Sequence, residues 1–456
     1  MKKSQLIFMF SVLVCFHVKA QINWDLGGRI KNAVERKVDQ GIDRTIDKGV
    51  DEAEEGIRKG GKEATEKDQK DPKSNSGSNN SGSNSGSNTN SGGDNGTQNT
   101  PTQSTYKTYS KFDFVPGEKV VAVEDFSQDA IGDFPARWNT NAAGEIVTVE
   151  GKQGKYFQLT SDGVSYPEFI TDLPENFTFE FDLICNPEYS YYSTSLMVNF
   201  TALTSDKDYT FWKQYAGSWD KKINGVRLGF SPTNAGSTAG HSFYECWENG
   251  EVALKNDNGN VSQFNAKTGK NVIHVSIWRQ KQRMRVYVNE EKIWDIPKAF
   301  QVGVKYNKVL FTIGGYHNEN DKLSVGNLRL AVGAPDTRNK LITEGKFVTN
   351  GILFDVNSDK IKPESYGAIK DIANVLNENP DVKVKIIGHT DSDGDEAKNL
   401  ELSKKRSEAV KNFLIKEFAI SADRMQTDGK GESQPTMDNA TIEGKANNRR
   451  VEFLKM

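Results

Sequence analysis

A tract that cannot fold constrains this chain more than any other feature. Residues 71–105 read DPKSNSGSNNSGSNSGSNTNSGGDNGTQNTPTQST, a run dominated by Ser, Asn, Gly and Thr. Such a segment cannot bury enough apolar surface to offset its conformational entropy, so we predict a disordered, flexible linker. The rest of the 456-residue chain is long enough for more than one domain. The sequence therefore predicts a multidomain protein.

The first residues, 1–20, have the pattern of an export signal peptide, MKKSQLIFMFSVLVCFHVKA. Lys2 and Lys3 supply the positive start, an apolar run follows, and the small residue Ala20 ends the segment. The run is shorter than the about 20 apolar residues that a membrane-spanning helix needs. Val14 before Cys15 disfavours a lipoprotein signal. We therefore expect an exported protein located in the periplasm.

Residues 21–70 are highly charged and carry a sparse apolar stripe that includes Ile30, Val34, Val38 and Ile42. Steps of four residues favour a helix whose stripe winds slowly around it. We predict a charged, partly helical segment exposed to solvent. Self-association into a homo-oligomer and contact with a membrane surface remain alternatives for this segment.

Residues 106–335 have the pattern of an all-β domain. In FTFEFDL, Phe177, Phe179 and Phe181 alternate with polar residues, as in a strand with one buried face. Similar short runs follow, separated by turn residues, and they predict a β-sandwich of two antiparallel sheets. The opening VVAVEDFSQDAIGDFPARW weakly resembles concanavalin-like and laminin-G-like jelly rolls. An oxidising compartment permits Cys185 and Cys246 to pair, but either could also be a buried thiol.

Residues 336–456 alternate between strand and helix patterns. We predict strands at 351–356 and 382–389, helices at 362–380 and about 396–417, and short strands near 424–430 and 449–456. The order β-α-β-α-β-β gives an α/β domain with a mixed sheet and helices on one side.

The densest chemistry lies in GHTDSDGDEAKNLELSKKR, residues 388–406. Asp391, Asp393 and Asp395 alternate as in a calcium loop, but Glu396 and Leu402 occupy the positions where that loop needs Gly and Glu. Zinc would need a second His or Cys nearby. Acids at this spacing are typical turn formers and helix caps, and no catalytic set accompanies them. We expect no metal, no cofactor, no catalytic residue and no enzymatic activity.

If the second half of this stretch is a helix, its residues predict a binding cleft. Asn399, Leu402, Ser403 and Arg406 line one helical face, and Asp391 follows the strand that leads into this helix. Ligands bind at that edge of open sheets. A carboxylate and a guanidinium around one cleft would suit a ligand with an ammonium and a carboxylate group. The alternative is that Arg406 only forms a surface ion pair with a neighbouring acid.

The stretch IIGHTDSDGDEAKNLELSKKRSEAV, together with GKGESQPTMDNATIEGKANNRRVEF, resembles the C-terminal domain of the OmpA/MotB/Pal family. The resemblance implies non-covalent binding of peptidoglycan through the diaminopimelate of its stem peptide. On this resemblance Asp391 takes the ammonium and Arg406 the carboxylate, and Arg449 braces the site. The resemblance also assigns a supporting role to Gly388, His389, Thr390, Asn399, Leu402, Ser403, Phe354 and Asp355. His389 is expected to serve as a structural turn residue.

These expectations describe a non-enzymatic cell-envelope protein, associated with peptidoglycan and the cell outer membrane. The formal net charge of −3 gives no electrostatic reason to expect a nucleic-acid partner. We expect the β-sandwich to contact another partner, which is either a component of the outer membrane or a glycan. In the alternative, the sandwich binds or processes glycans and the C-terminal domain only localises it to the wall. The residues to inspect for that alternative are Glu245, Trp247, Glu248, Trp212 and Trp219.

Overall fold

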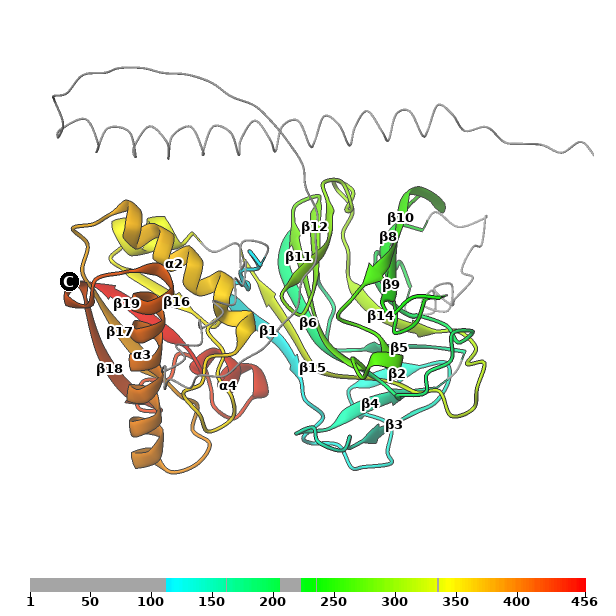
Figure 1. The fold of residues 1–456 in the computed structure, drawn as a ribbon, viewed down its shortest axis with the longest axis horizontal. Coiled ribbons are helices and arrows are strands. Elements are labelled where there is room, and N and C mark those ends of the chain that lie inside the picture. The colour runs from blue at the N-terminus through cyan, green and yellow to red at the C-terminus, as the bar shows by residue number, and fades with distance from the viewer. Residues whose placement is uncertain (1–111, 161, 206–222, 235, 334–335) are drawn as a thin grey trace, which may run out of the picture. The chain divides into compact units, whose positions relative to one another are not determined.

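The computed structural model describes residues 112–456, except 161, 206–222, 235 and 334–335. The expected signal peptide, charged segment and linker, and also Trp212 and Trp219, lie outside the described residues. In the described part the chain is mostly β-sheet, followed by a C-terminal unit that combines strands and helices (Figure 1).

The first sheet contains eight strands in the order β13-β12-β11-β6-β15-β4-β3, with β1 paired to β15. Every pairing in this sheet is antiparallel. Its strands are β1 (Lys119–Glu124), β3 (Gly144–Val147), β4 (Tyr156–Leu159), β6 (Asn176–Cys185), β11 (Val272–Gln280), β12 (Arg283–Val288), β13 (Glu291–Ile296) and β15 (Leu323–Val332).

The second sheet contains seven strands in the order β10-β9-β8-β7-β14-β5-β2, and it is also antiparallel. Its strands are β2 (Trp138–Thr140), β5 (Gly163–Pro167), β7 (Leu196–Thr201), β8 (Gly225–Ser231), β9 (Gly240–Glu248), β10 (Glu251–Val261) and β14 (Lys308–Ile313). A short 3₁₀ helix, Ala266–Thr268, precedes β11.

The two sheets share one apolar core. Phe177, Phe179 and Phe181 of β6 are fully buried in it, as their alternation predicts, and they contact Phe200 of β7 and Phe311 of β14. Aromatic pairs at these separations contribute about 0.5–1.5 kcal/mol each beyond the burial of their area. The jelly-roll likeness of this domain stays a prediction.

The opposite face of β6 is also buried, although its polar pattern predicts contact with solvent. Glu180 is only 2% exposed, and its carboxylate accepts a hydrogen bond of 2.6 Å from Arg329. His274 lies between Glu180 and Asp182, at 3.5 Å and 2.7 Å. Burial alone would lower the pKa of His274, but its bonds to the two carboxylates raise that pKa to about 10. This face is a charged cluster in which each charge has a partner.

The C-terminal unit has a four-stranded sheet in the order β16-β19-β17-β18, in which only β17 and β18 are parallel. Helices α2 and α3 pack with this sheet around one apolar core (Figure 1). The elements are β16 (Lys346–Thr349), α2 (Tyr366–Glu378), β17 (Val384–His389), α3 (Glu396–Phe418), β18 (Met425–Gly431), α4 (Ile442–Asn448) and β19 (Val451–Lys455). A π-helical turn, Asn339–Thr343, and 3₁₀ turns at Pro363–Ser365 and Ala422–Arg424 complete it.

Two elements differ from the sequence prediction. The first strand lies at 346–349 rather than 351–356, because the chain turns after Thr349 and Leu353 bonds to Ser365 and Lys362 instead of a neighbouring strand. Helix α4 was not predicted. Its N-cap is Thr441, whose hydroxyl accepts from the N–H of Gly444, and this bond stabilises a helix too short for a periodic pattern.

Strand β1 is bonded to helix α4. The side-chain amide of Asn447 accepts from the N–H of Val120 at 3.1 Å and donates to its carbonyl at 2.9 Å. Nearby, Glu118 pairs with Lys340 at 2.6 Å and Arg137 with Glu443 at 3.3 Å. The amide therefore satisfies both main-chain groups of one strand residue, as a neighbouring strand would.

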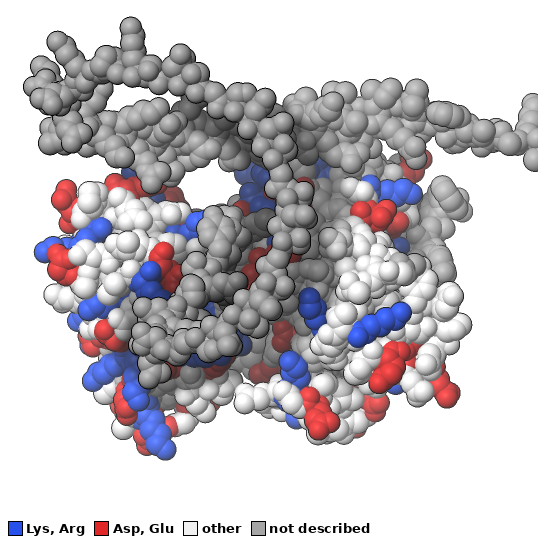
Figure 2. Space-filling model, in the orientation of Figure 1, with Lys and Arg blue, Asp and Glu red and all other residues white. Residues whose placement is uncertain are grey.

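Cys185 and Cys246 are free, buried thiols, so the pairing that the sequence left open is not formed. Burial raises the pKa of Cys246 to about 12. Among the described residues, no helix is both long and apolar enough to cross a membrane. On the face shown in Figure 2, acidic and basic side chains of the described residues are interspersed.

We predict that Phe179→Ala lowers the free energy of unfolding of the β-domain by about 3–5 kcal/mol, because it leaves a cavity among packed aromatic rings. Val302→Ala is the control, since Val302 is 75% exposed and its loss should change stability by less than about 0.5 kcal/mol. Denaturant unfolding followed by fluorescence measures both. Equal stability of the two variants would contradict the shared core.

Candidate functional site

The acidic loop begins where β17 ends, at the carboxyl edge of the only parallel strand pair in the described C-terminal sheet. Thr390 donates its N–H to the carbonyl of Gly431 on β18 at 2.9 Å. Asp391 is 8% exposed, and its carboxylate pairs with Arg449 at 2.5 Å. The hydroxyl of Thr390 is buried without a hydrogen-bond partner in the described structure. The strand thus delivers Asp391 to the sheet edge where the sequence places it.

The three alternating carboxylates of this loop point to three different partners. Asp391 pairs with Arg449, and Asp393 pairs with Lys445 at 2.7 Å. Asp395 is the N-cap of α3 and accepts from the N–H of Lys398 at 3.0 Å. Carboxylates that neutralise separate cations and a helix end do not converge on one metal ion.

Helix α3 lies very close to the strands beneath it. Ser403 is fully buried, and a Cβ on Gly388 would lie 2.2 Å from its carbonyl oxygen. The hydroxyl of Ser403 accepts from the N–H of Gly431 at 2.9 Å, and a Cβ on Gly429 would lie 2.4 Å from that hydroxyl. Glycine is required at both positions because only a residue without a side chain permits this approach. Ser403 therefore holds the helix to the sheet.

Asn399 supports the acidic loop from inside. Its amide donates to the carbonyl of Asp393 at 3.0 Å and to the carboxylate of Glu432 at 2.6 Å. Asn399 is buried, whereas Leu402 is half-buried on the same helix. These bonds fix the loop that carries Asp391, so Asn399 acts on the cleft through that loop.

Arg406 projects from α3 over the loop that follows β16. Its Nε donates to the carbonyl of Ser358 at 2.9 Å, and its guanidinium lies 4.9 Å from the centre of the Phe354 ring. Its other hydrogen bond goes to the carbonyl of Asp355 at 3.5 Å, while the Asp355 carboxylate pairs with Lys360. Burial lowers the pKa of Arg406, and the charge of Asp391 opposes that change. The Phe354 ring and the main-chain oxygens of Ser358 and Asp355 thus fix the orientation of the Arg406 guanidinium.

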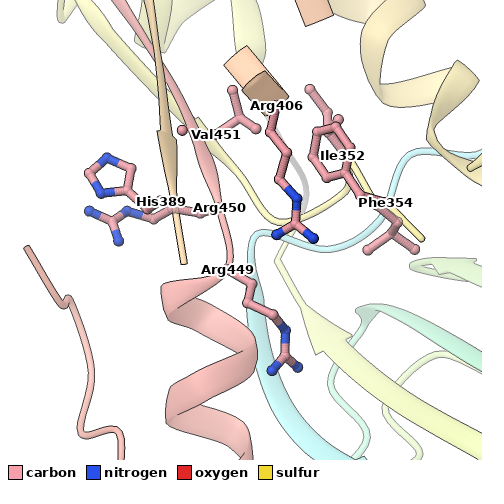
Figure 3. Close-up of a pocket in the computed structure, with 9 residues that line it drawn as sticks. Ile352, Phe354, His389, Arg406, Arg449, Arg450 and Val451 are labelled. Carbon is pink, nitrogen blue, oxygen red and sulfur yellow. The ribbon is translucent and has the colours of Figure 1, made fainter. Parts of the chain in front are cut away.

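Arg406 and Arg449 line one pocket, and in Figure 3 their side chains lie one above the other, away from those of His389 and Arg450. The pocket is lined by Ile352, Leu353, Phe354, Gly388, His389, Arg406, Arg449, Arg450 and Val451. The sequence predicted Phe354, Gly388, His389, Arg406 and Arg449 near a common cleft. It missed Ile352, Leu353, Arg450 and Val451. The alternation in RRVEF was the available signal for Arg450 and Val451. Asp391 reaches the pocket through Arg449, whose guanidinium it holds.

His389 and Arg450 extend away from Arg406, on the other side of the strand in Figure 3. Arg450 pairs with Glu452 at 2.8 Å, and His389 lies 3.6 Å from the same carboxylate. Burial and the charge of Arg450 lower the pKa of His389 to about 4, so the ring is neutral at pH 7. His389 is the last residue of β17, whereas the sequence predicts a turn residue at this position.

Two carboxylates of the glycan-processing alternative, Glu245 and Glu248, lie on opposite faces of β9. Glu245 and Glu248 are separated by three positions on β9, so their side chains point to opposite sides of the sheet. Glu245 lies 3.5 Å from Arg227, and Glu248 is exposed beside a half-buried Trp247. A pair of cooperating carboxylates needs one common cleft. Glu245 and Glu248 of β9 therefore do not face a common cleft.

A family model described as the OmpA family matches residues 353–449. Those residues form an OmpA family domain, which confirms the resemblance found in the sequence. The match spans the loop of Phe354, the acidic loop, α3 and the residues up to Arg449.

Several relatives match the same part of the chain. Outer membrane porin F of Pseudomonas aeruginosa is 43% identical over 101 residues, which are 22% of this chain and 29% of that protein. The probable lipoprotein YiaD of Escherichia coli is 41% identical over 104 residues, 23% of this chain and 47% of that one. Peptidoglycan-binding protein ArfA of Mycobacterium bovis is 37% identical over 108 residues, 24% and 33% of the two chains.

The chain spans less than half the length of each of these relatives. Among solved structures, the peptidoglycan-associated lipoprotein from Burkholderia pseudomallei is similar, with a TM-score of 0.23 and 23% identity. That likeness covers 26% of this chain and 100% of the other.

The neutral His389 predicts a pH dependence of stability. Its pKa in the folded state is below the ordinary value of about 6.5, so the unfolded chain takes up the proton first as the pH falls. The contribution of His389 is therefore fully present above pH about 6.5 and is lost as the pH falls toward about 4. His389→Gln should make the unfolding free energy of the C-terminal domain fall less steeply across this interval.

Denaturant unfolding at several pH values measures the slope. His317→Gln serves as the control, because it removes an exposed histidine of the β-domain. A slope unchanged by His389→Gln would show that the buried ring does not govern this pH dependence.

Proposed function

We propose that the C-terminal domain binds peptidoglycan non-covalently and anchors the exported protein in the cell envelope. The observation that carries this proposal is that Arg406 lines the cleft of an OmpA family domain together with Arg449, whose guanidinium pairs with Asp391. Relatives of this domain are named as outer membrane, lipoprotein and peptidoglycan-binding proteins, and the envelope location predicted from the export signal agrees with these names.

The chemistry of the cleft suits the diaminopimelate of the stem peptide, which carries an ammonium and a carboxylate on its side chain. Arg406 is held in place by the Phe354 ring and the Ser358 carbonyl, so a ligand carboxylate finds a pre-oriented guanidinium. Asp391 accepts from Arg449, which is itself half exposed. The ligand ammonium takes its place beside Asp391 as Arg449 shifts or shares the carboxylate.

The Arg449 pair has a clear physical role in the free protein. A buried carboxylate without a partner is costly, and removing one member of a buried pair costs about 3–5 kcal/mol. Arg449 neutralises Asp391 while the cleft is empty. The domain therefore keeps a desolvated carboxylate ready for a cation without losing stability.

The expected affinity of one site is modest, and this suits a reversible anchor. Hydrogen bonds to charged groups contribute about 1.5–3 kcal/mol each. A polymer that offers many identical stem peptides allows rapid rebinding, which strengthens attachment without any new contact. The role requires binding only, so we propose a non-enzymatic protein.

We predict that Asp391→Ala and Arg406→Ala each abolish co-sedimentation of the full chain with purified sacculi. Each change leaves one charge of the bound ligand without its partner, a loss of about 2–5 kcal/mol. Matched controls are Asp172→Ala and Arg338→Ala, because both side chains are exposed and lie outside the cleft. Circular dichroism checks folding. Unchanged sedimentation of both folded cleft variants would falsify the site.

Free diaminopimelate should release the protein from sacculi, whereas lysine at the same concentration should not. Lysine has the side-chain ammonium but lacks the second carboxylate that Arg406 is placed to bind. Titration of bound protein with each amino acid measures the difference. Equal release by both would show that the carboxylate contact contributes nothing.

A further inference from the structure

Two loops of the β-domain present an exposed group of aromatic rings, which we name the Tyr192 platform. It consists of Tyr191, Tyr192 and His317. Tyr191 and Tyr192 lie between β6 and β7, are 46% and 74% exposed, and have ring centres 5.3 Å apart at 71°. His317 lies between β14 and β15, and its ring centre is 5.1 Å from that of Tyr192. Residues distant in sequence therefore build one aromatic surface.

A buried carboxylate holds the two loops together. Asp321 is fully buried and accepts hydrogen bonds from the N–H of Ser190 and the hydroxyl of Ser193. The Ser193 oxygen in turn accepts from the N–H of His317 at 2.7 Å. In addition, Asn186 accepts from the N–H of Lys322 at 2.8 Å. These bonds cross from one loop to the other, so the two backbone segments that carry the rings are held together before any ligand arrives.

Exposed tyrosines carried by a well-supported backbone are suited to recognition. Single exposed apolar residues are common, but aromatic rings bury large areas when they can and dominate binding energetics. Tyrosine provides large contact area at low conformational cost because it has few rotatable bonds. A rigid support lowers that cost further. The Tyr192 platform thus has the properties of a binding surface.

The charged and polar residues around the platform indicate which class of ligand it can bind. Glu188 and Glu319 are exposed on the same two loops, and the ammonium of Lys322 donates to the carbonyl of Glu319. Acidic neighbours disfavour anionic polymers and anionic membranes. Asn318 and Asn320 add polar side chains to the loop that carries His317, and amides can both donate to and accept from hydroxyl groups. A neutral ligand with flat apolar faces and hydroxyl edges satisfies all of these conditions.

We propose that the Tyr192 platform binds saccharide chains, with pyranose rings stacked on Tyr192 and Tyr191 and hydroxyl groups bonded to the neighbouring amides. The site is distinct from the peptidoglycan cleft and shares no residue with it. It recognises sugar, whereas the cleft recognises a charged amino acid. The two sites therefore contact different chemical groups.

The test uses the full chain carrying Arg406→Ala, so that attachment through the stem peptide does not contribute. Retention is measured on insoluble chitin, on cellulose and on peptide-free glycan strands prepared from sacculi. We expect retention on at least one of the three, weakened about three- to tenfold by Tyr192→Ala and kept by Tyr192→Trp. Val302→Ala, which also removes an exposed apolar side chain of this domain, should leave retention unchanged.

The pattern across the three supports identifies the source of the sugar. Retention on glycan strands alone indicates the wall, and retention on chitin or cellulose indicates another polysaccharide. Binding to vesicles of phosphatidylethanolamine and phosphatidylglycerol is measured in parallel. Absence of retention on every polysaccharide, retention that Tyr192→Ala does not change, or binding to vesicles alone would overturn the proposal. None of these results depends on whether the cleft binds diaminopimelate.

Discussion

The close approach of α3 to β17 and β18 determines the geometry of the cleft. Ser403 rests directly on Gly388 and Gly429, where no side chain separates helix from strand. Because the helix is rigid, this contact also fixes the position of Arg406, which follows about one turn later and is half-buried at the pocket. A larger residue at either glycine would lift the helix and move the guanidinium away from Phe354. Packing between helix and strand at the edge of the pocket thus sets the chemistry of the site.

Charge balance around the cleft explains why so many ions can gather there. Arg449 neutralises Asp391, Arg450 neutralises Glu452, and Lys445 neutralises Asp393. Burial raises the pKa of Glu452, but bonds from Lys346 and Arg450 outweigh this effect and hold that pKa below its usual value. Arg406 differs from this group, since its hydrogen bonds go to main-chain oxygens. It is the cation of the cleft that a ligand carboxylate can reach at least cost.

The sequence predicted much of this arrangement from two kinds of pattern. Alternation located β6 and its three phenylalanines, and the helical spacing of Asn399, Ser403 and Arg406 located one face of α3. Spacing could not reveal how deeply each residue of this face is buried. Asn399 and Ser403 lie in the interior, whereas Arg406 lines the pocket. It also could not reveal the pair between Asp391 and Arg449, which are far apart in the chain. The short elements α4 and β16 were not predicted either. A cap stabilises α4 and long-range hydrogen bonds stabilise β16, and neither element is long enough to show a periodic pattern.

The pairing of β15 determines how the β-domain responds to force on the chain that follows it. The C-terminal domain follows β15 in the chain, and β15 lies between β6 and β4 with β1 also paired to it. Lys119 of β1 lies opposite Val332 of β15, so the chain enters the one strand and leaves the other at the same end of their antiparallel ladder. Force applied at these two points would open that ladder one bond at a time, beginning at Val332, instead of loading all of its bonds together in shear.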